Sequence, residues 1–244
     1  MILIVGNNHD DVLYFESLSR DAREEIILNK YHATLGLIFN QQVLLLKDVY
    51  TSFLSAALLT HIILKYHVLV VFNVGKCRTL SRELRCGDIA VSKKILFGDV
   101  DQVGSVKGTK LGQIPTLPVS FEINPNLLAV INQTLDRITR TRHFECTYLS
   151  SSIYTLDYSE IERFEETLSI KGESNEIVID DDAAGCALAC DLFDVPLIAV
   201  KVVESKADEE PSVDTYLRVL KQYSLLGKAV VSCIGEIGRN DILR

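Results

Sequence analysis

The chain has 244 residues, of which 48% are hydrophobic and 24% charged, and its formal net charge is −8. This composition excludes a disordered chain, because it supplies enough apolar side chains for a large core. The acidic balance argues against a nucleic-acid-binding protein, since such proteins neutralise phosphates with clustered Lys and Arg. A small-molecule or protein partner fits better. Because α/β domains of about 250 residues are common, we expect residues 1–244 to form a single domain.

No segment is typical of export or of membrane insertion. The apolar run at residues 1–5 is too short for a signal peptide. No stretch approaches the roughly 18–20 apolar residues that cross a bilayer. The six cysteines lack CxxC spacing, and a domain of this size does not need disulfides to fold. We expect a cytoplasmic protein with free thiols and no membrane contact.

The first third of the chain alternates between strand-like and helix-like patterns. Residues 2–5 form a short apolar run that ends at Gly6, and the polar residues 7–11 lead into a helix start. Residues 33–39 and 42–47 flank Asn40-Gln41 and predict a hairpin. Apolar residues recur at helical spacing over 51–66. The continuous apolar run at 68–74 predicts a central strand covered on both faces.

The alternation continues to the end of the chain. Residues 75–86 are interpreted as a basic loop, and 97–118 as a long connection punctuated by Gly and Pro. Strands are expected at residues 88–92, 144–149, 176–179 and 197–203. Helices are expected from Asn124-Pro125, over 158–170 and 183–193, and from Ser212 onward. The pattern predicts an α/β fold with three layers, α/β/α, around a mixed central sheet.

Four predicted strand ends carry polar residues. In sheets of this kind, ligands bind in the crevice beyond the carboxyl ends of strands. The four clusters are residues 7–11, 73–78, 180–182 and 204–208.

Asp180, Asp181 and Asp182 form an acidic triplet between an apolar strand and a helix of small residues. One interpretation is an N-cap followed by acidic residues that complement the helix dipole. The other is that at least one carboxylate faces a ligand hydroxyl. The sequence leaves both open.

Two basic residues, Lys76 and Arg78, follow Gly75 and are either solvated surface charges or an anion site. Cys186 and Cys190 lie one helical turn apart, but without a second pair of ligands nearby they are better explained as small core residues. The sequence contains no HExxH motif, no dinucleotide fingerprint and no Walker loop. We therefore expect no metal and no cofactor.

Several segments, taken in order, resemble the nucleoside phosphorylase and nucleosidase superfamily, nearest the methylthioadenosine/S-adenosylhomocysteine nucleosidases. Together with the N-terminal strand and turn, the resemblance covers nearly the whole chain in order. The segments are Gly87-Asp88-Ile89-Ala90-Val91-Ser92, Phe97-Gly98-Asp99-Val100-Asp101, Gly112-Gln113-Ile114-Pro115, Asp194-Val195-Pro196-Leu197-Ile198-Ala199-Val200-Lys201 and Ser212-Val213-Asp214-Thr215-Tyr216-Leu217.

The resemblance implies cleavage of the N-glycosidic bond of a purine nucleoside or thionucleoside. In that family a Glu near the N-terminus activates water, a Glu before the small-residue helix holds the ribose hydroxyls, and an Asp after the last strand protonates the purine. The matching positions here are Asp11, Asp182 and Ser205. Each of the three differs from the family residue.

Further positions depart from the family pattern. Lys76 stands where the family has a hydroxyl residue, and Leu156 where it has an aromatic ring against the purine. The phosphorylases use an Arg just after the first strand, and Asn7-Asn8-His9 supplies none, which favours water over phosphate. Glu204 can replace the missing acid at Ser205 only if the strand ends or bulges there, because successive side chains on a strand point to opposite faces.

Two main hypotheses follow from the residues. The first is a nucleosidase, an N-ribosyl hydrolase, with altered catalytic positions. The second is a catalytically impaired member that binds a nucleoside or serves a structural role, and a nucleoside phosphorylase is a further alternative. The resemblance also implies a homodimer in which residues 97–118 border the partner.

Overall fold

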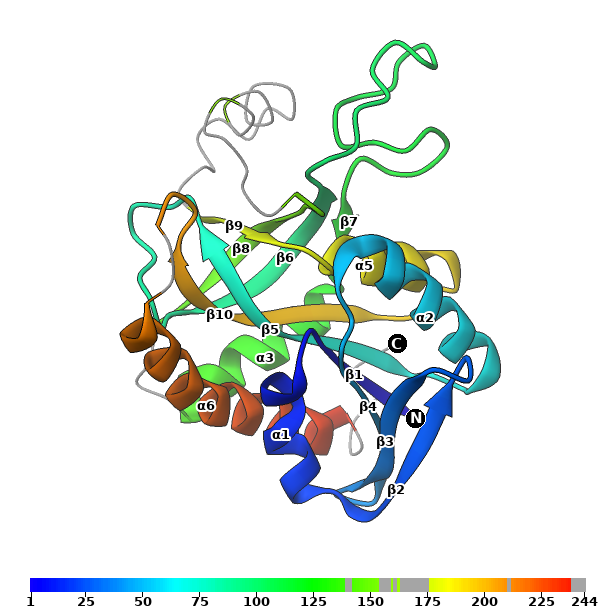
Figure 1. Cartoon of the computed structure of the whole chain (residues 1–244), viewed down its shortest axis with the longest axis vertical. Helices are drawn as coiled ribbons and strands as arrows, with labels where there is room; N and C mark the ends of the chain where they lie inside the picture. Colours follow the sequence, from blue (N-terminus) through cyan, green and yellow to red (C-terminus); the bar gives the residue numbers. More distant parts are fainter. Residues whose placement is uncertain (139–141, 154–158, 160–161, 163–175, 210–211, 238–244) are drawn as a thin grey trace.

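The computed structural model shows a mixed β-sheet with helices packed against it (Figure 1). The structure describes residues 1–138, 142–153, 159, 162, 176–209 and 212–237. Helices α2 (Thr51–Lys65) and α5 (Ala183–Leu192) pack against each other on one side of the sheet. A second group covers the other side and consists of α1 (His9–Leu18), α3 (Pro125–Ile138) and α6 (Val213–Ile237). This arrangement confirms the α/β class predicted from the sequence.

Within the described residues the sheet has ten strands. Those before the long connection are β1 (Ile2–Gly6), β2 (Arg20–Ile27), β3 (Tyr31–Ile38), β4 (Gln41–Leu46), β5 (Val70–Thr79) and β6 (Ile89–Phe97). Those after it are β7 (Phe121–Glu122), β8 (His143–Ser150), β9 (Ile177–Asp180) and β10 (Leu197–Lys206).

The strands β5, β10, β6, β8 and β9 form a closed circuit, because β10 pairs with both β5 and β6. From β5 the sheet continues outward through β1, β4, β3 and β2. Ile4, Phe72 and Ile198, on β1, β5 and β10, are fully buried in the main core. The near-continuous apolar runs of these strands are explained by their coverage on both faces.

The parallel strands β1, β5 and β10 bring their carboxyl ends to one edge of the sheet. Strand β9 crosses this edge, where it pairs antiparallel with the last two residues of β5. The polar clusters predicted at the ends of β1, β5, β9 and β10 therefore converge in space. This edge carries the candidate site.

The prediction of a basic loop from Gly75 onward is wrong for its first part, because β5 continues to Thr79. Cys77 and Thr79 are buried, whereas Lys76 is exposed, so the segment alternates as a strand does. Pairing with β9 and β10 extends the strand. The charges that suggested a loop instead lie on the outward face of a paired strand.

Strand β2 was missed because its sequence is charged along most of its length. It is the last strand in the sheet order, and charged edge strands are a common protection against aggregation. The hairpin is confirmed, since β3 and β4 pair antiparallel. The helix predicted over residues 158–170 lies outside the described residues apart from 159 and 162.

The connection between β6 and β7 protrudes from the body of the molecule (Figure 1) and consists mainly of turns. All six cysteines are free, as expected. In the part of the chain that the structure describes, no helix has both the length and the apolar character needed to span a bilayer.

Candidate functional site

A cavity of about 280 Å³ lies at the carboxyl edge of the sheet. Its walls come from the ends of β1, β5, β9 and β10 and from the segments that follow β4 and β8. It is lined by Asn7, Asn8, Tyr50, Lys76, Cys77, Arg78, Ser151, Ile153, Ile179, Asp180, Asp181 and Glu204. Of the residues predicted for the site, this cavity brings together Lys76, Asp180, Asp181 and Glu204.

The acidic triplet separates into three different environments. Asp180 has both oxygens engaged, because its Oδ1 accepts from the Ser150 hydroxyl and its Oδ2 accepts from Lys201 Nζ at 2.6 Å. That second oxygen also accepts the backbone N–H of Ala183 at 3.0 Å. Asp180 thus supplies the side-chain cap of α5, whereas Asp182 stands at the N-cap position without a side-chain cap bond.

Asp182 is fully buried and its carboxylate is engaged inside the protein. One oxygen accepts from Lys201 Nζ, and the other accepts from Asn73 Nδ2 at 2.6 Å. Burial raises the pKa of Asp182 to about 8, and the charge of Lys201 opposes that rise. Asp182 does not line the cavity. The residue that matches the family's ribose-binding carboxylate is therefore turned into the core.

Lys201, a fully buried lysine on β10, holds this arrangement together. Burial alone would lower the pKa of Lys201, but Asp180 and Asp182 outweigh that effect and keep it well above its ordinary value. The lysine therefore remains charged. A buried charge is tolerated only when it is paired and hydrogen-bonded, and Lys201 has two carboxylate partners.

Asp181 lines the cavity as Asp180 does, but its side chain is only partly buried, whereas those of Asp180 and Asp182 are fully buried against Lys201. Its Oδ1 accepts from Asn7 Nδ2 at 2.5 Å, across the gap between β9 and the end of β1. Its backbone carbonyl accepts from the Ser52 hydroxyl at 3.2 Å, at the start of α2. Among the described residues, no side chain donates to its second oxygen.

Asp11, predicted as the base, lies behind Asn7 and Asn8 rather than on the cavity wall. Its Oδ2 accepts the backbone N–H groups of these two residues at 2.9 and 3.0 Å, completing a capping box with Asn8 at the start of α1. Burial raises the pKa of Asp11. A Cβ added at Gly75 would lie 3.1 Å from Asp11 Oδ2, so glycine permits this close approach of β5.

Glu204 and Ser205 occupy an irregularity in β10. The register with β5 shifts between Val203 and Ser205, so a bulge is present at the position where the sequence analysis required one. Glu204 lines the cavity, and its Oε1 accepts from Lys76 Nζ at 2.6 Å. Ser205 is buried, and its hydroxyl donates to the backbone carbonyl of Lys206 at 3.0 Å.

The sequence analysis missed Tyr50, which lines the cavity, and Lys201, which holds Asp182 beneath it. Asn7 and Asn73 belong to two of the predicted polar clusters, but their individual contacts were not predicted. Their partners Asp181 and Asp182 are more than 100 residues away in the chain, and no local motif marks such contacts. Leu156, predicted to face the purine, lies outside the described residues.

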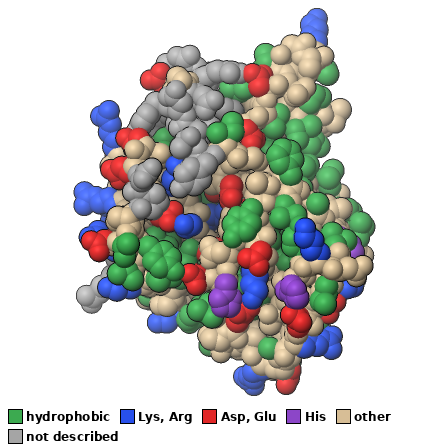
Figure 2. Space-filling model, viewed as in Figure 1, with side chains coloured by type: hydrophobic (Ala, Val, Ile, Leu, Met, Phe, Trp, Pro, Cys, Tyr) green, Lys and Arg blue, Asp and Glu red, His purple; other side chains and the backbone are tan. Residues whose placement is uncertain are grey.

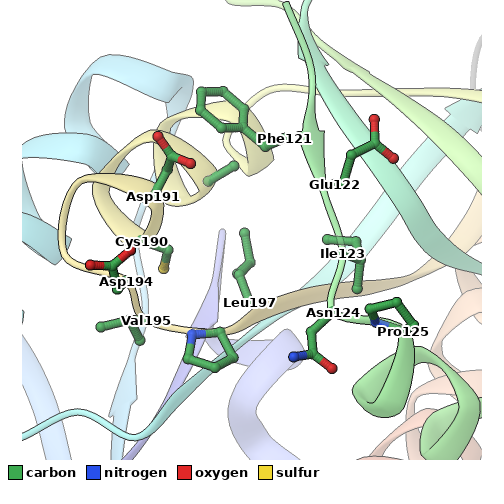
Figure 3. Close-up of a pocket in the computed structure, with 12 residues that line it drawn as sticks. Phe121, Glu122, Ile123, Asn124, Pro125, Cys190, Asp191, Asp194, Val195 and Leu197 are labelled. Atoms are coloured by element: carbon green, nitrogen blue, oxygen red, sulfur yellow. The ribbon is translucent and has the colours of Figure 1, made fainter. Parts of the chain in front are cut away.

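A larger cavity of about 510 Å³ lies near the amino end of β10. Figure 3 shows Asp191 and Asp194 from the end of α5 on one side of it, and Glu122 and Asn124 from the segment before α3 on the other. We assign the site to the smaller cavity because it lies at the carboxyl ends of parallel strands, where ligands of such sheets bind. It also gathers the buried and paired charges described above.

Figure 2 shows acidic and basic side chains interspersed over the visible face, without a broad region of one sign among the described residues. In the same described part of the chain, no group of three or more His, Cys, Asp or Glu side chains is placed to hold a metal ion.

A family model described as the phosphorylase superfamily matches residues 2–233. The chain belongs to the phosphorylase superfamily. One relative, the 5′-methylthioadenosine/S-adenosylhomocysteine nucleosidase of Marinomonas sp. (strain MWYL1), is 24% identical over 229 residues, which cover 93% of this chain and 95% of the relative. The corresponding nucleosidase of Staphylococcus haemolyticus is 25% identical over 215 residues, covering 87% of this chain and 90% of the relative.

Solved structures of such nucleosidases have the same fold. The enzyme of Neisseria meningitidis, in complex with methylthio-immucillin-A, gives a TM-score of 0.84 at 16% identity over 96% of this chain and 97% of that one. The enzyme of Colwellia psychrerythraea, in complex with adenine, gives 0.82 at 18% identity over 96% and 94%. These findings confirm the resemblance inferred from the sequence.

Proposed function

We propose that this member of the phosphorylase superfamily is an N-ribosyl hydrolase. Its substrate class is a purine nucleoside or thionucleoside, such as methylthioadenosine or S-adenosylhomocysteine. The observation that carries the proposal is the β10 bulge, which places Glu204 on the cavity wall beside the substituted Ser205. The likeness to nucleosidases over nearly the full length of the chain supports it.

The reaction needs a base on one side of the scissile bond and an acid on the other. Water attacks the anomeric carbon of the ribose, and its proton passes to a base, for which we propose Asp11. The bond between the anomeric carbon and the purine nitrogen breaks, and its electron pair stays on the purine. The leaving purine then takes a proton from Glu204. Paired carboxylates divide acid and base work in this way in other hydrolyses at an anomeric carbon. Burial raises the pKa of Asp11, which makes its carboxylate a stronger base than a free Asp.

The experiment is a substrate panel. The pure protein is incubated with methylthioadenosine, S-adenosylhomocysteine, adenosine, inosine and uridine, and release of free base is followed with and without phosphate. We expect release from at least one purine nucleoside, independent of phosphate. Phosphate-dependent release would identify a nucleoside phosphorylase instead. No release from any compound at high protein concentration would overturn the proposal.

A second candidate is a nucleoside-binding member without catalytic activity. The engagement of Asp182 by Lys201 and Asn73 favours it, because this carboxylate is not available to a ligand in the described arrangement. This candidate predicts that nucleosides raise the melting temperature without any base being released. Thermal melts in the presence of the same panel therefore separate the two candidates.

We also propose, from the length and segment pattern of the sequence, that residues 1–244 form one domain and that the protein is cytoplasmic. The family resemblance implies a homodimer. No cofactor enters the proposed reaction.

A further inference from the structure

We propose that Asp181, rather than Asp182, is the carboxylate that binds the ribose hydroxyls of the substrate. This inference rests on the proposed function, because it assumes that the ligand of the cavity is a ribonucleoside. It assigns a specificity-determining role to the neighbour of the residue that the family resemblance indicates.

The first step is elimination among the three carboxylates of the turn between β9 and α5. Both oxygens of Asp180 accept hydrogen bonds from Ser150, Lys201 and the Ala183 amide. Both oxygens of Asp182 accept from Lys201 and Asn73, and the residue is fully buried. The side chains of Asp180 and Asp182 are both fully buried in their ion pairs with Lys201, so neither presents a carboxylate oxygen to the cavity.

The second step is the geometry of Asp181. Its side chain lines the cavity, and its Oδ1 is held by Asn7 Nδ2, which fixes the direction of the carboxylate. Within the described part of the chain its Oδ2 receives no hydrogen bond. The Ser52 contact to its carbonyl and the Ser55 contact to the carbonyl of Asp182, at 2.9 Å, anchor the turn to α2. A positioned carboxylate with one uncommitted oxygen thus faces the ligand space.

The third step is the chemistry of the ligand. Hydroxyl groups donate to a carboxylate in charge-assisted hydrogen bonds, which are about twice as strong as neutral ones. In a ribonucleoside the adjacent 2′- and 3′-hydroxyls supply two such donors, and a 2′-deoxynucleoside lacks one of them. A site with this carboxylate therefore prefers ribose to deoxyribose.

The test compares adenosine, 2′-deoxyadenosine and 3′-deoxyadenosine in the parent protein and in Asp181→Asn. Binding is measured by calorimetry, and kcat/KM is compared for any nucleoside that is turned over. We expect the parent to prefer adenosine by about ten- to a hundredfold, the range for a hydrogen bond to a charged group. Asparagine keeps an oxygen for Asn7 but removes the charge, so we expect this preference to fall at least several-fold.

Two further variants complete the design. Asp191→Asn, at the opposite end of α5 and outside the cavity, should leave the preference unchanged. Asp182→Asn should lower the melting temperature, since its amide would face Asn73 Nδ2, but should keep the preference for ribose. If Asp182→Asn does not fold, the comparison of Asp181→Asn with Asp191→Asn still decides the question.

The outcomes are distinguishable. Unchanged ribose preference in Asp181→Asn, its loss in Asp182→Asn alone, or a parent that binds all three nucleosides equally would each overturn the assignment of Asp181 and leave the proposed function standing. A parent that binds none of the purine nucleosides would overturn the proposed function and this assignment with it.

Discussion

The bulge in β10 determines which side chain of the Glu204-Ser205 pair reaches the cavity. In a regular strand the two would point to opposite faces. The register shift after Val203 places Glu204 on the wall, in contact with Lys76, while Ser205 bonds to the backbone of its own strand. The proposed acid therefore occupies the position before the one that the family resemblance indicates.

Replacing Glu204 tests this assignment at the scale of one residue. We expect Glu204→Gln to lower kcat by about 10²–10⁴-fold, the usual contribution of a placed general acid. The matched control is Glu209→Gln, an exposed residue five positions further along the chain and outside the cavity, which should leave kcat unchanged. Single-turnover base release measures both. Full activity in Glu204→Gln would exclude it as the acid.

The variant Ser205→Asp separates the two positions. If the cavity lacked an acid altogether, a new carboxyl at 205 would raise the rate by about 10²–10⁴-fold. Because the Ser205 side chain is buried and points to the Lys206 carbonyl, we expect no gain and some loss of stability. A large gain in base release would show that position 205, not 204, serves the leaving group.

Asp11 gives a prediction for pH dependence. As a base it must be ionised, so its activity is present above its folded pKa and is lost as the pH falls through that value. Burial raises the pKa of Asp11, which places the acid limb of kcat/KM above the value of about 3.9 of a free Asp. We expect Asp11→Asn to remove this limb and to lower the rate.

The measurement is a pH–rate profile of the parent and the variant. Asp10→Asn is the matched control, because Asp10 is adjacent in sequence but its carboxylate accepts from Tyr216 at the surface. The role of Asp11 as the base would be contradicted if the acid limb of kcat/KM lay at the pKa of a free Asp. It would also be contradicted if the limb persisted in Asp11→Asn.

At the scale of elements, the site depends on how closely α5 packs against α2. A Cβ added at Gly185 would lie 1.9 Å from the Ser52 carbonyl oxygen, so only glycine allows these helices to approach as they do. This approach brings Ser52 and Ser55 to the carbonyls of the acidic turn. The small-residue composition of α5 therefore fixes the position of Asp181.

The buried network under the turn gives a prediction for stability. Removing Lys201 leaves two buried carboxylates without their cation, and breaking such a pair costs about 3–5 kcal/mol. The folded pKa of Asp182 already exceeds its unfolded value, so the stability contributed by this group is full at low pH and is lost as the pH rises through about 8. Without Lys201, the folded pKa of Asp182 rises further, because the charge that opposes the effect of burial is gone. We therefore expect Lys201→Met to lose more stability at pH near 8 than near 5.

Urea unfolding at the two pH values measures this difference. Lys206→Met is the matched control, because the Lys206 ammonium donates to the backbone carbonyls of Ser81 and Leu84 rather than to carboxylates. Its loss of stability should be the same at both pH values. An equally pH-independent loss in Lys201→Met would contradict the network described here.

The elements that the sequence predicted well have patterns that reflect local burial. The apolar runs of β1, β5 and β10 and the helical spacing of α2 identified these elements. Strand β2 and the end of β5 were not predicted, because their residues are charged and are held as strands only by their neighbours in the sheet. Tertiary pairing overrides local preference in such segments.

At the scale of the whole molecule, the strand-end clusters along the chain predicted that polar side chains converge at one edge of the sheet, but not how the charges pair there. Asp180, Asp181, Lys76 and Glu204, four of the residues predicted for the site, line the candidate cavity. The sequence could not show that Lys201 holds Asp182 in the core, because a lysine within an apolar strand has no pattern that identifies its partner. The roles of these residues stay predictions.

The last prediction concerns assembly. The family resemblance implies a homodimer in which residues 97–118 border the partner, and this connection protrudes from the body in Figure 1. It presents Val103 and Val106, whose exposed fractions are 56% and 52%. Burying such side chains against a partner is favourable by roughly 25 cal/mol per Å² of apolar surface. We expect sedimentation velocity to give a dimer at micromolar concentration.

The double variant Val103→Asp/Val106→Asp should shift the sedimentation boundary toward the monomer, because charges at the centre of an interface lose their hydration without gaining a partner. Leu13→Asp is the control, since Leu13 is similarly exposed but lies on α1, at the other end of the molecule. It should sediment as the parent does. A parent that sediments only as a monomer would overturn the proposed dimer, and a double variant that stays fully dimeric would place the interface on another surface.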